Sequence, residues 1–531
     1  MAERAAESRP PGSGSNPPLD SLTPEQHRIV AYASAIGSEF DFSLLLGAMG
    51  IDEETLAEEV ERLVHRGVLV ERAGGERFAF AEEEFRARIY RSLTESRLRV
   101  LHRKIGEVLE RTHPDPSLAV LTELGRHYFL GKVTAKSYEY NRRASEAARA
   151  AGDPEVAAHH LERVLLDLAS LPGDHWAEQA RVAETLGDLY FSLGNFRGAD
   201  LRYTEALERL GSESPAVRAR LLLSRAEVAR EGLDLDTAIT LGSDAERLFD
   251  ELGDRPGGAQ ARRVLGRIAF QRGGYREALD ALMAALDFAE GQDDPQFHGR
   301  LAIDLGNCFA LLGSEFRDIA VEWYQRAIAR LAQVEDWVEL SRAYHNLGVS
   351  VGEVRPQEGL EYLEKAQQAG ERGHDVRMTA RALLSGVEML IALGQIEEAE
   401  RDNEQAGRLL EHIADMLGRE QVQLSRGLIA ERRAQWDDAE RAFEQAVEMC
   451  RRYQLPGDEA EAAFHLARLR YKTRDLDGAR RAFAIATDLG LPELRPALAA
   501  PFTELGANLG IARSSNRPST PGGPASATPS P

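Results

Sequence analysis

Small and aromatic residues recur at a fixed spacing along most of this 531-residue chain. One copy of the pattern reads Leu186-Gly187, Gly194-Asn195-Phe196, Ala199, Tyr203 and Ala206, and another reads Leu265-Gly266, Gly273, Tyr275, Ala278, Leu282 and Ala285. The central small residue of successive copies stands at positions 157, 199, 238, 278, 320, 359, 399, 439 and 479, so the interval is 39 to 42 residues. A fixed period of this length is typical of a repeat protein whose copies pack on their neighbours.

Each copy predicts two packed helices joined by a turn. The first small residue, as at Gly187, Gly266 and Gly427, lets two helices approach closely, and the next two small residues lie seven apart on one face of the second helix. A Gly-x-Phe/Tyr element ends the first helix and places an aromatic ring at the corner. We therefore predict an all-α fold, a right-handed α-superhelix (α-solenoid) of about nine to ten helix pairs over residues 119–508, with helices of about 15 to 17 residues.

This spacing of glycine, aromatic and alanine residues resembles that of tetratricopeptide arrays. The period near 40 exceeds the roughly 34 residues of the standard repeat, so the chain is most similar to the longer-helix variety found beside bacterial signalling domains. The resemblance implies a protein-binding surface and no particular chemistry.

Residues 21–90 break the period and predict a small separate domain. Thr23 caps a helix that starts at Pro24, a short helix follows over 42–49, and a third spans 52–65 with an acidic first turn. Apolar and polar residues alternate over 68–80 on both sides of Gly74-Gly75, which predicts two short strands joined by a turn. Three helices and a hairpin indicate a degenerate winged helix, followed by a basic connecting helix over 91–118.

The segment that leads from the hairpin through Arg97-Leu98-Arg99 and Leu101-His102 into the repeats resembles multidomain signal-transducing ATPases of the maltose-activator type. In that family a winged helix connects an ATPase module to tetratricopeptide-like repeats. The present chain has Glu82 where the family usually has histidine, and it contains no Gly-x4-Gly-Lys-Ser/Thr motif to cradle a triphosphate. A separately encoded ATPase or kinase is therefore one expected partner.

Composition narrows the classes of function and the cellular locations that remain. The formal net charge of -22 disfavours nucleic-acid binding by the chain as a whole. Cys308 and Cys450 are far apart and form no metal-binding pair, and there is neither a signal peptide nor an apolar run of membrane-spanning length. We expect a cytoplasmic protein without membrane contact, with disordered Pro/Ser/Gly-rich tails at 1–20 and 509–531.

A local basic patch interrupts the acidic average. It holds one acid, Glu95, and seven cationic residues: Arg86, Arg88, Arg91, Arg97, Arg99, Arg103 and Lys104. The patch could contact nucleic acid or an acidic partner, or it could be a solvated helix packed on the acidic helix over 52–65. That acidic helix would be the DNA-recognition helix of a winged helix, and its carboxylates would face phosphates, so direct DNA binding through it is disfavoured.

In tetratricopeptide superhelices, the residue six positions before the first small residue points into the concave groove. Arginine stands there in five copies, and the copy between them contributes two more arginines; together these are Arg181, Arg220, Arg263, Arg267, Arg300, Arg342 and Arg381. Guanidinium groups spaced along one groove could bind the carboxylates of an acidic peptide. Alternatively, each pairs with a carboxylate of this acidic chain.

No catalytic, cofactor-binding or metal-binding constellation emerges. The sequence has no Gly-x-Ser-x-Gly or His-Glu-x-x-His motif, and the adjacent His159 and His160 fit ordinary surface histidines. We therefore expect a non-enzymatic interaction scaffold or sensor arm in a bacterial signalling pathway, which binds a protein or peptide in its groove. The alternative is a transcription regulator that binds DNA through the winged helix and senses a signal through the repeats.

Overall fold

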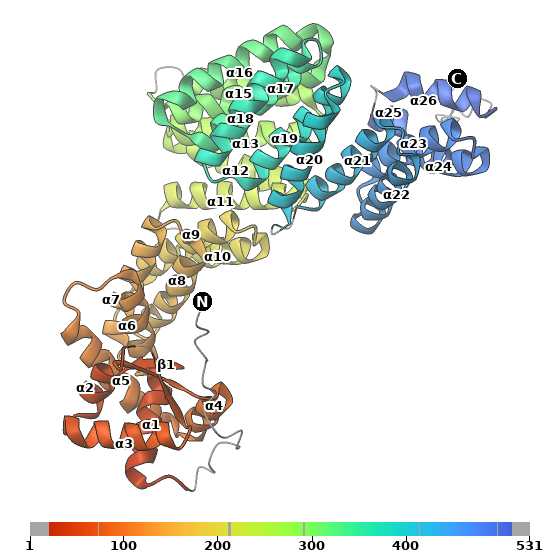
Figure 1. The fold of residues 1–531 in the computed structure, drawn as a ribbon. Helices are drawn as coiled ribbons and strands as arrows, with labels where there is room; N and C mark the ends of the chain where they lie inside the picture. The colour runs from red at the N-terminus through yellow and green to blue at the C-terminus, as the bar shows by residue number, and fades with distance from the viewer. Residues whose placement is uncertain are drawn as a thin grey trace, which may run out of the picture. The chain divides into compact units, whose positions relative to one another are not determined.

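The structure is a computed structural model that describes residues 21–72, 74–210, 214–289, 293–411, 413, 415–495 and 498–511. It divides into two compact units, Met1–Val264 and Leu265–Pro531, and each is described by itself (Figure 1). The predicted tails at 1–20 and 512–531 lie outside the described residues. Residues 509–511 were also predicted to belong to the tail, but the structure describes them. Leu509 is buried, and its carbonyl accepts a 3.3 Å hydrogen bond from Arg480. The folded part therefore continues past the predicted end at residue 508.

The chain begins with three helices and a small sheet. They are α1 (Pro24–Ile36), β1 (Glu39–Asp41), α2 (Phe42–Met49), α3 (Glu53–His65), β2 (Leu69–Glu71) and β3 (Arg77–Phe80). Thr23 caps α1 and forms a capping box with Gln26. The sequence missed β1, which is only three residues long; it pairs antiparallel with β3, so that Phe40 lies opposite Phe78 and the sheet has the order β1-β3-β2.

The basic segment forms two helices rather than one. They are α4 (Glu83–Ser92) and α5 (Glu95–Thr112), separated by Leu93 and by Thr94, which caps α5. The predicted connecting helix over 91–118 is therefore shorter than expected. α5 packs on α1, α2 and the next helix, and the core that they share includes Leu45, Leu101 and Ile105.

The first unit continues with consecutive helices. They are α6 (Leu118–Leu130), α7 (Thr134–Ala150), α8 (Pro154–Leu168), α9 (Trp176–Ser192), α10 (Phe196–Leu210), α11 (Pro215–Glu231) and α12 (Leu235–Leu252), and α13 (Arg255–Gln271) crosses into the second unit. Within the described part of the first unit, α7 packs on α8, α9 on α10, and α11 on α12.

The second unit has the same organisation. Its helices are α14 (Tyr275–Ala289), α15 (Pro295–Leu312), α16 (Arg317–Leu331), α17 (Trp337–Gly352), α18 (Pro356–Arg372), α19 (Val376–Leu393), α20 (Ile396–Leu410), α21 (Met416–Arg432), α22 (Trp436–Tyr453), α23 (Pro456–Lys472), α24 (Leu476–Asp488), α25 (Leu491–Leu494) and α26 (Ala499–Asn508). From α15 to α24, each odd-numbered helix packs on the following even-numbered one. The predicted all-α architecture of repeated helix pairs is confirmed.

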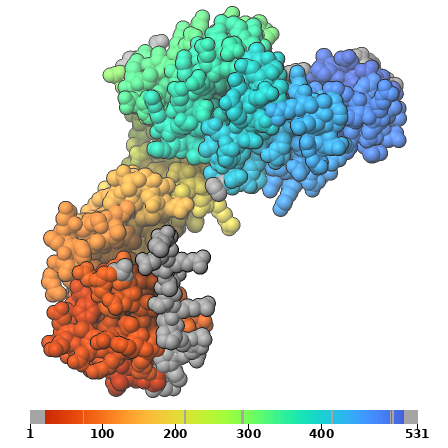
Figure 2. Space-filling model, viewed as in Figure 1, coloured from red at the N-terminus to blue at the C-terminus, as the bar shows by residue number. Residues whose placement is uncertain are grey.

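Each glycine of the repeat pattern makes room for a large side chain of the second helix. A Cβ atom added to Gly187 would lie 2.6 Å from the ring of Tyr203, and one added to Gly427 would collide with the ring of Phe443. Both rings are buried, as are the alanines before and after them, such as Ala199. Figure 2 draws the visible face of each unit with all its atoms, which close over the gaps between the ribbons of Figure 1. Ala and Gly at these contacts therefore set the distance between paired helices.

The turn between paired helices needs a left-handed residue, and glycine supplies it in only some copies. Gly194 has φ +72° and Gly273 has φ +83°, but Leu233, Ala434 and Arg474 adopt φ values of 63°, 57° and 69°. A side chain with a Cβ atom is strained in this conformation, at a cost of about 1–2 kcal/mol. The predicted glycine is therefore a preference of this turn, not a requirement.

We expect Leu233→Gly to raise the free energy of unfolding by about 1 kcal/mol, because it relieves left-handed strain. Leu233 is 71% exposed, so little apolar burial is lost. Urea unfolding followed by circular dichroism measures the effect. The matched control is Leu201→Gly within α10, where a 53% exposed leucine is helical and glycine should destabilise by about 1 kcal/mol. Destabilisation by both substitutions would contradict the strain at Leu233.

Candidate interaction surface

The arginines predicted to line a groove all lie on the first helices of the pairs. In the first unit, Arg181 is exposed on α9 and Arg220 is exposed on α11. Arg220 donates from Nε and Nη2 to the two carboxylate oxygens of Glu184 on α9, at 2.6 and 3.0 Å. This bidentate pair links two consecutive repeats. Arg263 is half-buried on α13.

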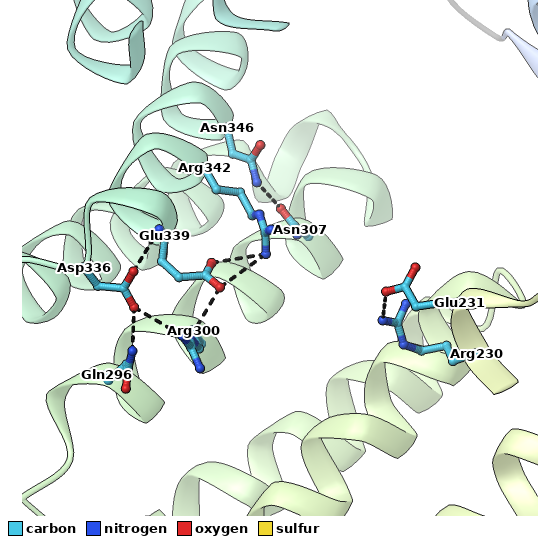
Figure 3. Close-up of polar contacts among 9 residues, drawn as sticks. All are labelled: Arg230, Glu231, Gln296, Arg300, Asn307, Asp336, Glu339, Arg342 and Asn346. Atoms are coloured by element: carbon cyan, nitrogen blue, oxygen red, sulfur yellow. Dashed lines mark hydrogen bonds and ion pairs between the residues drawn. The ribbon is translucent and has the colours of Figure 1, made fainter. Parts of the chain in front are cut away.

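In the second unit, two of the predicted arginines converge on one carboxylate. Arg300 on α15 lies 3.3 Å from Glu339 on α17, and Arg342 lies 3.1 Å from the other oxygen of Glu339 (Figure 3). Arg300 also lies 3.3 Å from Asp336, which caps α17. Pairing within the chain, one of the two sequence-based alternatives, is therefore what the structure has at Arg220, Arg300 and Arg342.

The same face continues with neutral polar contacts between first helices. Asn346 on α17 donates to Asn307 on α15 at 2.8 Å, and His345 lies 3.0 Å from the hydroxyl of Ser385 on α19 (Figure 3 shows the asparagine pair). Burial, with a smaller contribution from the charge of Arg381, lowers the pKa of His345 to about 4. Arg381 itself is exposed on α19, and Arg267 is half-buried on α13. Polar side chains thus connect three consecutive first helices of this unit.

The residues of the basic patch are divided between α4 and α5 and do not rest on the acidic helix. Arg86 pairs with Glu83 at 2.6 Å and donates to the carbonyl of Ser34 at 3.0 Å, and Arg99 pairs with Glu95 at 3.0 Å. Helix α3 packs mainly on α1 and β2. The expected packing of the basic segment on the acidic helix is therefore wrong. The remaining cations of the patch are exposed: Arg88, Arg91, Arg97, Arg103 and Lys104.

A buried chain of histidines, which the sequence did not reveal, joins the start of the array to α4. The hydroxyl of Tyr90 lies 2.9 Å from Nε2 of His102, whose Nδ1 lies 2.9 Å from Nδ1 of His127 on α6. Burial lowers the pKa of His102 to about 3 and that of His127 to about 4. Both imidazoles are therefore neutral at neutral pH and act as hydrogen-bonding core residues.

His160 also corrects an expectation, because it is fully buried rather than on the surface. Its Nδ1 lies 2.8 Å from Oδ1 of Asn141, and its Nε2 lies 3.2 Å from the hydroxyl of Thr122. Burial lowers its pKa to about 4. His159, its neighbour, is exposed as expected.

Four carboxylates that the sequence reasoning overlooked gather in the second unit. They are Glu388 on α19, Glu420 on α21, and Asp458 and Glu461 on α23. Burial and the charges of Asp458 and Glu461 raise the pKa of Glu420 to about 8. A hydrogen bond with the Cys450 thiol acts in the opposite direction. The pKa of Glu388 is likewise raised, because neighbouring helices desolvate its carboxylate although the side chain stays exposed, and because Glu461 carries a like charge. Arg495, which follows α25, pairs with Asp458 at 2.5 Å and with Glu461 at 2.9 Å.

The repeat register contains the signal that could have found Glu420. Seven positions before the first small residue, the other copies have a small residue: Ala180, Ala219, Ala259, Gly299, Ser341, Ala380 and Ala460. Glu420 occupies this position in its own copy. One position later, where five copies have arginine, the last two have Gln421 and Glu461. The arginine row therefore gives way to an uncharged amide and an acid at the C-terminal end.

Three further observations concern other kinds of site. Among the described residues, no group of three or more His, Cys, Asp or Glu side chains is arranged to hold a metal ion. Cys308 and Cys450 are both buried and unpaired, and burial raises the pKa of the Cys308 thiol to about 12. No helix in the described ranges has the length and apolar character needed to cross a bilayer.

The second unit also has clefts along its second helices. One cleft of about 480 Å³ is lined by residues of α18, α19 and α20. Another of about 450 Å³ is lined by residues of α20, α21 and α22. Charged side chains of both signs line them, including Asp402 and Arg401 in the larger cleft. These clefts do not contain the predicted arginines.

The known proteins that the chain resembles include proteins with tetratricopeptide repeats. No curated protein sequence matches the chain. The chain is similar to the solved structure of a signal-transduction ATPase with numerous domains and a tetratricopeptide repeat sensor from Pyrococcus horikoshii. That protein is 13% identical with a TM-score of 0.41, and the match covers 92% of this chain and 66% of the other.

The chain is also similar to aspartyl phosphate phosphatase F from Bacillus subtilis, at 13% identity and a TM-score of 0.45, over 68% of this chain and 93% of the other. A Rap protein complexed with competence and sporulation factor is 15% identical with a TM-score of 0.42, over 73% and 96% of the two chains. One family model matches directly: residues 424–490, from α21 to the end of α24, match a tetratricopeptide repeat.

Proposed function

We propose that the chain is a non-enzymatic protein-interaction scaffold or sensor arm of a bacterial signalling pathway, and that a protein or peptide partner binds the first-helix face of its repeats. The observation that carries this proposal is the row of polar side chains in one register of successive first helices, from Arg181 to Arg381. Within this row, Arg220 and Arg300 pair with carboxylates of neighbouring first helices and so hold the polar face together between repeats. Arg181 and Arg381 are exposed there and can donate to a partner's carboxylates.

The N-terminal elements support a second part of the proposal, a degenerate winged helix. Their order of helix, strand, two helices and a hairpin fits that fold. Its third helix, α3, exposes Glu53, Glu54 and Glu58, which disfavours contact with DNA phosphates. We propose that it connects the array to a separately encoded ATPase or kinase. No gel retardation is expected at about 50 mM salt, and retardation would favour the transcription-regulator alternative.

The two free cysteines support a location in the cytoplasm, because buried thiols persist in a reducing compartment. The same compartment holds the signalling partners that we propose.

The scaffold proposal predicts that charge reversal on the first-helix face abolishes partner capture. Arg181→Glu combined with Arg381→Glu places acids where an acidic segment would bind, so capture of the partner from cell extract should fall at least about tenfold. The control reverses two exposed second-helix arginines, Arg330→Glu and Arg401→Glu, with the same change in net charge. Quantitative mass spectrometry of full-length bait measures both. Equal loss in the two variants, or no loss in either, would contradict binding at this face.

A further inference from the structure

Glu420 is a buried carboxylate without a packing reason. Glu420 is only 2% exposed, and its Oε1 atom has no hydrogen-bond partner. A buried polar atom left unpaired destabilises a fold by about 1–3 kcal/mol. Alanine, glycine or serine fills the same register position in the other copies, so the repeat does not require an acid here. The chain gives this carboxyl group a hydrogen bond with the Cys450 thiol, and its Oε1 atom is suited to a further partner that the described chain does not provide.

Negative charge dominates the surroundings of Glu420, and the charge of Arg495 offsets it only in part. Asp458 and Glu461 are close enough to raise its pKa, and Glu461 does the same to Glu388. Glu388 is exposed and accepts a long hydrogen bond of 3.5 Å from Gln421. Glu461 thus lies within electrostatic reach of both Glu388 and Glu420, and the guanidinium of Arg495 pairs with Glu461 and Asp458.

Arg495 shows which cation this geometry holds. Its Nη2 and Nε atoms contact carboxylates three positions apart on α23, at 2.5 and 2.9 Å. A planar guanidinium can reach two separate carboxylates in this way. The carboxylates among the described residues are too dispersed to enclose one metal ion. Arg495 engages Asp458 and Glu461, and Glu388 and Glu420 are left for a second guanidinium.

We propose that Glu388 and Glu420, with Asp458 and Glu461 beside them, form an acidic pocket that receives an arginine side chain from a basic segment of a protein partner. One of these carboxylates, Glu461, stands in the register of the arginine row, and Glu420 stands one position before that register in its own copy. Charge complementarity selects the partner, because an arginine both pairs with the exposed Glu388 and satisfies the buried Oε1 of Glu420. This inference rests on the proposed scaffold function and names the chemistry of its partner.

The test measures binding of a short peptide to the full-length protein. The probe is a fluorescein-labelled peptide of glycine and serine with two arginines, and its counterpart carries glutamine at both arginine positions. We expect the arginine peptide to bind and the glutamine peptide to fail. Glu388→Gln with Glu420→Gln should weaken binding at least about tenfold, whereas removing the same charge at exposed second-helix positions, Glu361→Gln with Glu397→Gln, should change it less than about twofold.

A second variant tests the pocket in the opposite direction. Arg495→Gln frees Asp458 and Glu461, so the arginine peptide should bind more tightly than to the unmodified protein, by several-fold or about 1 kcal/mol. Circular dichroism establishes that each variant is folded. The proposal is overturned if the two double variants weaken binding equally, if neither does, or if the glutamine peptide binds as well.

The chain's own tail is the competing occupant, because Arg513 and Arg517 are its charged residues. Replacing both by glutamine in the full chain should leave peptide affinity unchanged, and tighter binding would overturn the assignment to a partner protein. Failure of this inference is distinguishable from failure of the scaffold function. If the Glu388→Gln, Glu420→Gln protein still captures its partner from extract at full strength, only the pocket is wrong.

Discussion

Replacing Glu420 with glutamine is expected to stabilise the second unit, by an amount that grows as pH rises above about 4.5. The carboxyl titrates near 4.5 when unfolded and near 8 when folded. Between these values the folded protein retains a proton that the unfolded chain has released, so the unmodified protein loses stability as pH rises from about 4.5 to about 8. Glutamine keeps the shape and lacks the ionisation.

The expected gain in unfolding free energy is on the order of 5 kcal/mol at about pH 9 and close to zero near pH 4.5. Thermal unfolding of both proteins across this pH range measures it. Glu361→Gln, at an exposed position on α18, is the matched control and should stay within about 0.5 kcal/mol at every pH. A pH-independent difference between Glu420→Gln and the unmodified protein would show that the carboxyl ionises normally.

The second large effect concerns the spacing of the paired helices. Gly427→Ala makes the new Cβ atom collide with the ring of Phe443, and both residues are buried between α21 and α22. Because the ring is fully buried and has no room to move, we expect a loss of about 2–3 kcal/mol, typical of overpacking. Urea unfolding followed by circular dichroism measures the loss.

Gly386→Ala on α19 is the matched control for this substitution. A Cβ atom there would lie 3.5 Å from Leu360, an ordinary contact. Since alanine favours the helix over glycine, this variant should gain up to about 1 kcal/mol. If both alanines stabilise the protein, the glycine-to-ring contact does not set the helix spacing.

The periodic pattern predicted the fold well because residue size at the helix contacts determines how the helices pack. The glycine at 187 and the ring at 203 form one contact that repeats with the sequence period, so both the helix pairs and their turns could be placed in advance. Strand β1 escaped prediction because three residues carry too little alternation to be seen, and its pairing with β3 depends on the fold around it.

The candidate site was predicted only in part, and for a different reason. The register of the arginines was readable, but Arg220 and Arg300 pair with carboxylates 36 and 39 residues away on neighbouring first helices, Glu184 and Glu339. Sequence spacing offers many such carboxylates and does not choose among them. The acidic pocket was overlooked because Glu420 differs from the pattern only when the copies are compared at a position that carries no motif residue.

The most direct test of the first-helix face is photo-crosslinking of the partner by the full-length protein. A photoreactive amino acid is placed at Arg381 on a first helix, at Glu361 on a second helix, and at Arg91 in the basic patch, all three exposed. The account predicts a crosslinked partner from position 381 and none from 361 or 91. Crosslinks from 361 or 91 without any from 381 would contradict it, because the partner would then bind outside the first-helix face.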